Sequence, residues 1–362
     1  MNMHRLRTII GIELRQRVRS VGWYVLLGVF AVILIGLLGL SFAAFSLTTG
    51  GSEWFFSLVI MLVLLLTLLV SPTLSGSAVN GDRDAATLAP VQVTLATTGE
   101  IVLGKFLAAW ISGLAFLVVA APFLVIATIA GELNPAAIVT SLGILVIEVG
   151  VVAAIGVGLS AVIARPIFSV ASTYLLVAAL TLGTLIAFGL GGAALRTEAT
   201  TVSRDVDWTA VPPGCDPSAP VRSSDCPSYD DLPCVESTTV YEQPRFDRVW
   251  WLLAANPFVI LADATPPTYV GGNPTDLFTQ FASGVRLAQL PPEEPTTYDG
   301  CARSAQWYAD EYPSVQERVE GTTPSWFVGL LVQLILAGAL LAWGVARTRT
   351  PAKRLPPGTR IA

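Results

Sequence analysis

Few side chains of the kinds that carry out chemistry occur in this chain. His4 is the only histidine among the 362 residues, which argues against histidine-based triads and histidine-rich metal sites. We expect His4 itself to face solvent or lipid headgroups. Residues 99–105 have the glycine and lysine spacing of a phosphate-binding loop, but Phe106 stands where a Ser or Thr would hold Mg²⁺. We interpret this match as chance and expect the chain to hydrolyse no ATP by itself.

The four cysteines all lie between residues 196 and 324, and they are Cys215, Cys226, Cys234 and Cys301. An even number of cysteines in one segment predicts two disulfides in an oxidising compartment, and the spacing leaves all three pairings open. A four-thiolate zinc site is the alternative, which the lack of a Cys-x-x-Cys pair disfavours. We therefore predict two disulfides and no metal.

Glu148 lies near the middle of an apolar segment, LVIEVGVV. An ionisable side chain is costly inside a bilayer, so we expect Glu148 to face other helices or a cavity, which makes it a functional candidate. The alternative is a protonated or hydrogen-bonded glutamate that fixes helix packing. That alternative is favoured, because no second intramembrane charge is available as a relay partner. Small residues follow Glu148 and permit close helix contacts: Ala154, Gly156, Gly158 and Ser160.

The segments that must position these residues are those of a membrane protein. Hydrophobic residues make up 53% of the chain and charged residues only 13%, with a mean hydropathy of +0.65. Six apolar segments are long enough to cross a bilayer, and they are residues 21–47, 54–74, 106–130, 137–164, 167–195 and 325–346. We therefore expect an all-α membrane protein with six transmembrane helices.

Residues 1–20 precede the first of these spans and contain five arginines. Apolar residues recur at every fourth position: Leu6, Ile10, Leu14 and Val18. This pattern predicts an amphipathic helix that lies in the headgroup layer. A signal peptide is disfavoured, because the arginine-rich region is long and the apolar segment after it spans a bilayer without a clear cleavage site.

Lys and Arg concentrate in the N-terminal helix, in the linker of residues 75–105, at Arg165 and in the tail of residues 347–362. The short turns between the other spans contain neither residue type. The positive-inside rule therefore predicts a multi-pass protein of the cell membrane with both termini and the linker in the cytoplasm. Residues 196–324 are then an extracytoplasmic domain, since long domains translocate largely regardless of charge.

We expect this extracytoplasmic domain to be irregular and rich in loops, because proline-rich stretches such as residues 211–214 and 291–292 interrupt it. Residues 249–264 (VWWLLAANPFVILADA) are strongly apolar but short for a span. Two interpretations of them stay open. They are an interfacial or re-entrant helix near the outer leaflet, or they are the core of the domain.

The linker of residues 75–105 carries the most informative pattern. Its notable positions are, in order, Asp82, Arg83, Asp84, Thr87, Leu88, Pro90, Glu100, Gly104 and Lys105. Residues 97–100 combine hydroxyls able to cap a helix with a carboxylate near the positive end of the helix dipole. We predict a short helix or turn near residues 82–90, a break, and a second helix that enters the membrane.

At these positions the chain resembles the permease subunits of type-2 ABC exporters. In that family a cytoplasmic loop after the second span carries an acidic-Arg-acidic run, then Thr-Leu, then an acidic residue shortly before Gly-Lys. Ala86 departs from the family's usual glycine before Thr-Leu. The layout of residues 1–190 and 325–347 also resembles that of the family.

The resemblance implies a permease subunit that couples a separate ABC ATPase subunit to the movement of a hydrophobic or amphipathic substrate. Two permease copies, identical or homologous, would enclose the pathway among membrane lipids. The ATPase subunits would hold the ATP and Mg²⁺, so this chain would bind no cofactor and no nucleic acid. Docking on the ATPase would fall to the coupling loop, and thus to Asp82, Arg83, Asp84, Thr87, Leu88, Pro90 and Glu100.

Two other classes of function stay open. A proton-coupled secondary transporter would use Glu148, although neither inverted repeats nor broken helices with converging charges are evident. A membrane-anchored binding or assembly protein would use the extracytoplasmic domain, whose acidity and disulfides suit partner binding. Six spans are, however, more than anchoring requires.

Overall fold

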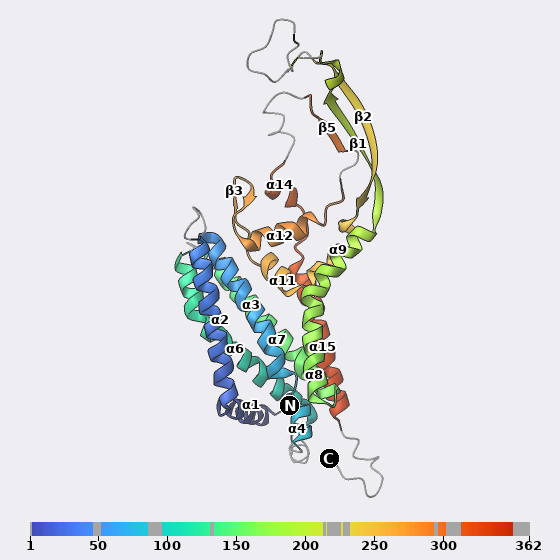
Figure 1. Cartoon of the computed structure of the whole chain (residues 1–362). Coiled ribbons are helices and arrows are strands. Elements are labelled where there is room, and N and C mark those ends of the chain that lie inside the picture. Colours follow the sequence, from blue (N-terminus) through green and yellow to red (C-terminus); the bar gives the residue numbers. More distant parts are fainter. Residues whose placement is uncertain are drawn as a thin grey trace.

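The computed structural model describes residues 2–45, 52–85, 96–130, 134–212, 215, 226, 232–292, 296–301 and 313–349. A bundle of long helices forms one end of the molecule, and a domain of strands and short helices forms the other (Figure 1). We call residues 196–324 the head domain. Six helices within the described residues are long and apolar enough to cross a membrane, which confirms the predicted number and identifies a multi-pass membrane protein.

The six spans lie close to the predicted positions. They are α2 (Val21–Phe45), α3 (Ser52–Ser75), α6 (Thr98–Ala130), α7 (Pro135–Val162), the succession of α8 (Pro166–Ala178), η1 (Ala179–Gly183) and α9 (Thr184–Ala194), and α15 (Trp326–Thr348). The third helix begins at Thr98 rather than at residue 106, because its polar first turns are capped. The fifth is interrupted by η1, a π-helical turn that was not predicted.

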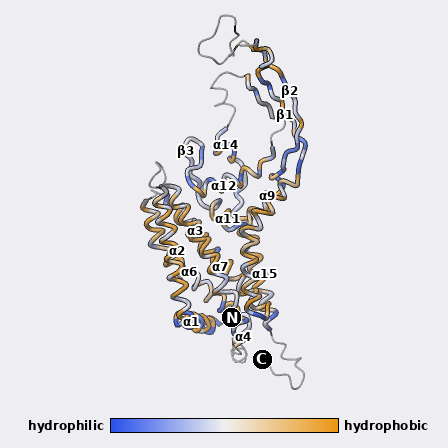
Figure 2. The backbone as a smooth tube through the Cα atoms, in the orientation of Figure 1, coloured by the Kyte–Doolittle hydropathy of each residue, from blue (hydrophilic) through white to orange (hydrophobic). Residues whose placement is uncertain are grey.

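The apolar residues of the bundle pack into a continuous core. Its fully buried large side chains include Phe30 of α2, Phe56 and Ile60 of α3, Phe116 of α6 and Leu145 of α7. Figure 2 shows that hydrophobic residues dominate the long helices and that the head domain and the opposite end are more polar. The outward faces of α2 and of α8–α9 remain apolar and exposed, as befits a surface against lipid or another apolar partner.

Two short helices lie at the end of the bundle opposite the head domain (Figure 1). They are α1 (Met3–Val18) and α4 (Asn80–Asp84). The stripe predicted for α1 is only partly buried, since Leu6 is buried but Val18 is 51% exposed. Helix α1 packs on α6 with Leu6 and Ile9, and Ile10 and Leu14 are half-buried, so the exposed end of the stripe is Val18.

The head domain contains a regular β-ribbon, which the expectation of an irregular, loop-rich domain missed. Strands β1 (Arg196–Val206) and β2 (Cys234–Pro244) pair antiparallel along their whole length. The short strand β5 (Thr296–Asp299) joins β1 in parallel. The prolines of residues 211–214 fall between β1 and β2, so they do not interrupt the ladder.

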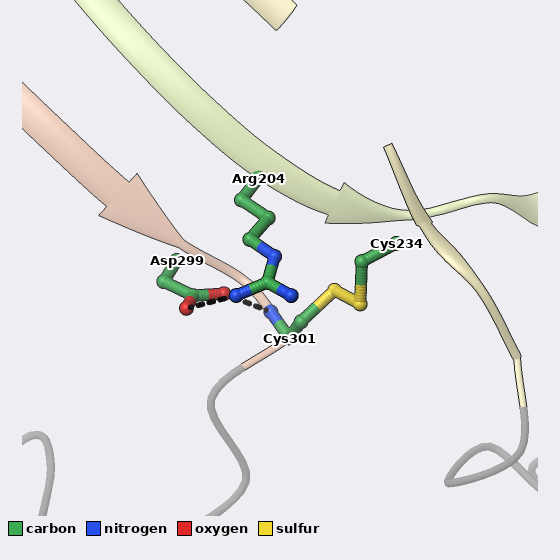
Figure 3. The surroundings of a disulfide bond; sticks show 4 residues. All are labelled: Arg204, Cys234, Asp299 and Cys301. Carbon is green, nitrogen blue, oxygen red and sulfur yellow. Dashed lines mark hydrogen bonds and ion pairs between the residues drawn. A yellow bond between two sulfur atoms is a disulfide. The ribbon is translucent and has the colours of Figure 1, made fainter. Parts of the chain in front are cut away.

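Both predicted disulfides are present, and they join Cys215 to Cys226 and Cys234 to Cys301. Figure 3 shows the second disulfide beside an ion pair between Arg204 and Asp299 (3.6 Å). The carboxylate of Asp299 also accepts a hydrogen bond from the backbone N–H of Cys301 (2.9 Å). These contacts hold the end of β5 against both strands of the ribbon.

Short elements make up the base of the head domain. They are η2 (Trp208–Ala210), η4 (Phe246–Arg248), α10 (Trp251–Ala254), α11 (Pro257–Ala264), β3 (Tyr269–Val270), β4 (Asn273–Pro274), α12 (Leu277–Leu287) and α14 (Val315–Val319). The ambiguous apolar segment 249–264 forms α10 and α11. Ile260, Leu261 and Ala262 of α11 are fully buried and belong to the same apolar core as the spans. The head domain and the bundle therefore share a core at this point.

Candidate functional site

The first candidate site is α4, the short helix that carries the predicted charged triplet. Asn80 begins this helix and is fully buried. The hydroxyl oxygen of Ser160, near the end of α7, accepts hydrogen bonds from the backbone N–H groups of Val79 (2.9 Å) and Asn80 (3.1 Å). The Asn80 amide nitrogen donates to the carbonyl oxygen of Ile163 (3.0 Å). These bonds fix α4 to the end of the fourth span.

A buried lysine joins α4 to two further helices. Lys105 of α6 is 2% exposed, and its ammonium group contacts the carboxylates of Asp82 in α4 (2.6 Å) and Glu13 in α1. A buried ammonium group is tolerated because it is paired and hydrogen-bonded. Three helices therefore meet at one set of charges, which we call the Lys105 cluster (Glu13, Asp82 and Lys105).

The N-terminal helix is fastened to the start of α6 at other points as well. Ile9 packs over Gly104, where an added Cβ would lie 2.7 Å from an Ile9 methyl carbon. Glu100 is buried and accepts hydrogen bonds from the backbone N–H groups of Asn2 and Thr97. The Thr97 hydroxyl accepts in return from the backbone N–H of Glu100 (3.3 Å), which completes a capping box. The helix N-terminus predicted at residues 97–100 is confirmed.

The residues predicted to dock on a partner fall into three groups. Arg83 is half-buried and Asp84 is exposed, and within the described residues neither takes part in an ion pair. Asp82 and Glu100 are engaged in the contacts above, which position the linker. Thr87, Leu88 and Pro90 lie outside the described residues.

The second candidate site surrounds Glu148, which lies halfway along α7. Its side chain is fully buried, and within the described residues neither of its carboxyl oxygens has a hydrogen-bond partner. The polar side chain that faces it is Gln333 of α15. The Oε1 atom of Gln333 is also buried and unpartnered, whereas its Nε2 atom donates to the carbonyl oxygen of Ala255 (3.0 Å). Glu148 thus faces a neighbouring helix.

Sequence reasoning missed four residues of these two sites, which are Glu13, Asn80, Ser160 and Gln333. Two of them carry a signal: Gln333 is the only amide side chain in the last span, and Asn80 is the first amide after the second span. Buried amides at such positions need hydrogen-bond partners, which marks them as points of contact between helices. Nothing in the sequence distinguishes Glu13 from a headgroup-facing charge or Ser160 from a small packing residue.

The described residues contain no group of three or more side chains able to hold a metal ion. Comparisons of the chain with models of protein families, with curated proteins and with solved structures found no match.

Proposed function

We propose that this chain is the permease subunit of an ATP-driven exporter of the ABC type, and that α4 and the linker after it dock on a separate ATPase subunit. The attachment of α4 to three other helices carries this proposal. Asn80 holds α4 to α7, and Asp82 holds it to α6 and α1 through Lys105. A displacement of α4 by a partner would therefore move the ends of several spans together, as coupling requires.

The exposed side of α4 supplies the charges for docking. Arg83 and Asp84 are the members of the acidic-Arg-acidic run that are not engaged in the Lys105 cluster. A guanidinium group forms strong, directional hydrogen bonds with carboxylates, so Arg83 would pair with an acidic residue of the ATPase. By the positive-inside rule this end of the bundle would lie in the cytoplasm, where it could meet an ATPase subunit.

The transported substrate would be hydrophobic or amphipathic, such as a lipid, a hydrophobic drug or an amphipathic peptide. The spans are apolar, and Glu148 is the ionisable residue halfway along one of them. The exposed apolar faces of α2 and α8–α9 offer surface for lipids and for the second permease copy that the proposal requires. ATP and Mg²⁺ would be held by the ATPase subunits.

The packing of the head domain favours transport over the anchored-binding alternative. An anchored module needs only a tether, whereas α11 packs on α7, α12 and α15 and shares the core of the spans. A head domain built into the bundle in this way would follow the movements of the spans. Its two disulfides agree with the extracytoplasmic side that the proposal assigns to it.

The experiment is a purification of the chain from its native membrane in mild detergent, with identification of the proteins that come with it. We expect an ATPase subunit to accompany the wild-type chain and to be lost from the double variant Arg83→Glu plus Asp84→Lys. The spans should remain folded in this variant, because Arg83 is only half-buried and Asp84 is exposed.

The matched control is Arg318→Glu plus Glu320→Lys, which makes the same charge exchange on exposed residues of the head domain. We expect the ATPase subunit to stay with this control. Absence of an ATPase from the wild-type preparation would overturn the proposed function, and equal loss from both double variants would overturn the role of α4.

A further inference from the structure

Strand β2 forms one edge of the larger sheet of the head domain, in which the strands lie in the order β2–β1–β5. One side of β2 pairs with β1 along the whole strand. On its other side, no backbone hydrogen bond joins β2 to any other of the described residues. Residues 235–242 are all exposed. Alternate residues of such a strand direct their N–H and C=O groups away from the neighbouring strand, so β2 presents a row of unpaired backbone groups.

The usual protections of an edge strand are missing from β2. Proteins commonly shorten their edge strands, place Lys or Pro in them, or interrupt them with a bulge. Strand β2 has eleven residues, and residues 235–243 contain no Lys, Pro or Gly. Its register with β1 runs one to one through every pair, without a bulge. Val, Thr and Tyr recur in it and favour an extended strand. This edge therefore suits the addition of a further strand, a common way to bind an extended segment.

The charges along β2 indicate what kind of strand would fit. Its charged residues are Glu236 and Glu242, which are six positions apart and so lie on the same face of the ribbon. Arg196 of β1 forms an exposed ion pair with Glu242 (3.3 Å). Arg204 lies opposite Glu236 but forms its ion pair with Asp299 of β5 (3.6 Å). The head domain as a whole contains nineteen acidic and eight basic residues. A strand with basic side chains therefore complements this edge.

A second copy of β2 complements the edge poorly. Thr239 is the middle residue of the strand. If two copies paired antiparallel about a two-fold axis at Thr239, Glu236 of each copy would lie opposite Glu242 of the other. Like charges directly opposite each other destabilise a pair of strands. Residues 235–243 also supply no Lys or Arg in any other register. The two glutamates therefore act against pairing of the chain with itself and favour a basic strand from elsewhere.

We propose that the outer edge of β2 binds an extended, basic segment of another protein on the same side of the membrane as the head domain. The segment adds a strand beside β2 through backbone hydrogen bonds, and its basic side chains lie beside Glu236 and Glu242. Figure 1 shows the ribbon rising from the end of α9 away from the spans. A segment bound there lies outside the bundle, which favours a partner protein over a substrate in transit. The proposal goes beyond the proposed function and does not depend on the ATPase.

The test uses a synthetic peptide as the probe, Ser-Thr-Lys-Thr-Val-Thr-Val-Thr-Lys-Thr-Ser with blocked ends, whose two lysines have the same spacing as Glu236 and Glu242. Its binding to the full chain in phosphatidylcholine nanodiscs is measured by fluorescence anisotropy, with empty nanodiscs as the blank. We expect the peptide to bind, and the same peptide with Glu in place of both Lys residues to bind roughly tenfold more weakly. No binding of the lysine peptide, or equal binding of the two peptides, would overturn the proposal.

Methylation of the peptide backbone separates strand addition from simple charge attraction. Two further lysine peptides carry N-methyl groups on alternate residues, one on the odd positions and one on the even positions. In an added strand only one of these two sets of N–H groups faces β2. We therefore expect one methylated peptide to lose binding and the other to keep it. Both have the same charge, so retention of binding by both would show attraction without strand addition and would overturn the proposal.

The double variant Glu236→Lys plus Glu242→Lys locates the binding site. We expect it to bind the lysine peptide roughly tenfold more weakly than the wild-type chain and to bind the glutamate peptide better. Both side chains are exposed, so the ribbon should keep its fold. The matched control Asp205→Lys plus Glu320→Lys makes the same change of charge on other exposed residues of the head domain and should bind as wild type. Unchanged binding by the first variant would place the peptide elsewhere, among the spans for instance, and would overturn the proposal.

The variant Thr239→Cys tests the second copy as the occupant. A two-fold pairing of β2 would bring the two introduced thiols together at the middle of the strand. We expect no disulfide-linked dimer of this variant in the membrane under mild oxidation. A dimer whose formation the lysine peptide blocks would assign the edge to a second copy and overturn the proposal. None of these outcomes changes what the purification experiment reports on the ATPase.

Discussion

The structural role of Lys105 could not be predicted from its neighbours in the sequence. In the sequence, Gly104 and Lys105 complete the spacing of a phosphate loop. In the fold, Gly104 leaves room for Ile9, and Lys105 pairs with carboxylates of two other helices. Both residues therefore help to hold the N-terminal helix α1 against α6. The Lys105 cluster stabilises the end of the bundle where we propose that the ATPase docks.

Replacement of Lys105 by Met tests the strength of this cluster. The variant removes the ammonium group that contacts the carboxylates of Glu13 and Asp82, and removal of one partner from a buried ion pair is costly. Because Asp82 is about one-third exposed, we expect a destabilisation of roughly 1–3 kcal/mol, below the full cost of a dry pair. Thermal unfolding in detergent should show a lower midpoint. Arg7→Met, which removes an exposed cation from α1, is the control and should leave the midpoint unchanged.

Local rules predicted some residues of the candidate site and could not predict others. The capping box of Thr97 and Glu100 follows from residues three positions apart, so the sequence is sufficient to find it. The bonds from Ser160 to Val79 and Asn80 join segments about eighty positions apart, and they depend on the packing of whole helices. The same applies to Gln333 and Glu148. Spacing along the chain carries no information on such pairs.

At the scale of elements, α7 is the helix to which both candidate sites are attached. Its middle holds Glu148, and its last turns hold Gly158 and Ser160. A Cβ added at Gly158 would lie 2.7 Å from a backbone carbon of Leu340 in α15, so these two helices cross at backbone contact. A motion of α4 would therefore reach α15 through α7. Interfaces of small residues permit such close crossings in membranes.

The variant Ser160→Ala should loosen α4 from α7. It leaves the backbone N–H groups of Val79 and Asn80 without their buried acceptor, at a cost of roughly 1–3 kcal/mol. We expect faster hydrogen exchange at residues 79–85. Ser112→Ala is the matched control, because among the described residues the buried Ser112 hydroxyl bonds only to Ala108 of its own helix. Equal exchange of residues 79–85 in the two variants would contradict the attachment described here.

The crossing of α7 and α15 gives a second prediction for this element. Gly158→Ala forces a methyl group against the backbone of α15, and we expect a destabilisation of roughly 1–3 kcal/mol from overpacking. The control Gly143→Ala lies on the same helix with nothing within 4 Å of the added Cβ. That control should be neutral or stabilising, because Ala favours a helix over Gly by up to about 1 kcal/mol. The midpoints of thermal unfolding of the two variants test both expectations. A midpoint of Gly143→Ala below that of the wild-type chain would contradict the packing described for α7.

The spans could be predicted from sequence with little error, whereas the head domain could not. A bilayer requires some twenty apolar residues in a row, and this constraint is visible in any sequence. The ribbon of β1 and β2 depends on pairing between strands that are separated by the disulfide-linked Cys215 and Cys226. The π-helical turn η1 is stabilised by Asn256, a residue far along the chain. The position of η1 therefore depends on this tertiary contact.

At the scale of the whole molecule, the head domain and the helices α1 and α4 lie at opposite ends of the bundle (Figure 1). The shared core around Ile260 and Leu261 joins the head domain to the spans, and the Lys105 cluster joins the spans to α1 and α4. Contacts therefore run without interruption from one end to the other. A movement at either end therefore has a continuous set of packed helices through which to reach the opposite end.

The orientation of the molecule in the membrane gives the last prediction. All four native cysteines are paired, so an introduced cysteine is the single free thiol. We expect Thr238→Cys, on the exposed strand β2, to react with a membrane-impermeant maleimide in intact cells. Arg7→Cys, on the exposed side of α1, should react only after the membrane is made permeable, because basic segments stay in the cytoplasm. The opposite pattern would place α4 outside the cell, away from any cytoplasmic ATPase, and the proposed coupling would fail with it.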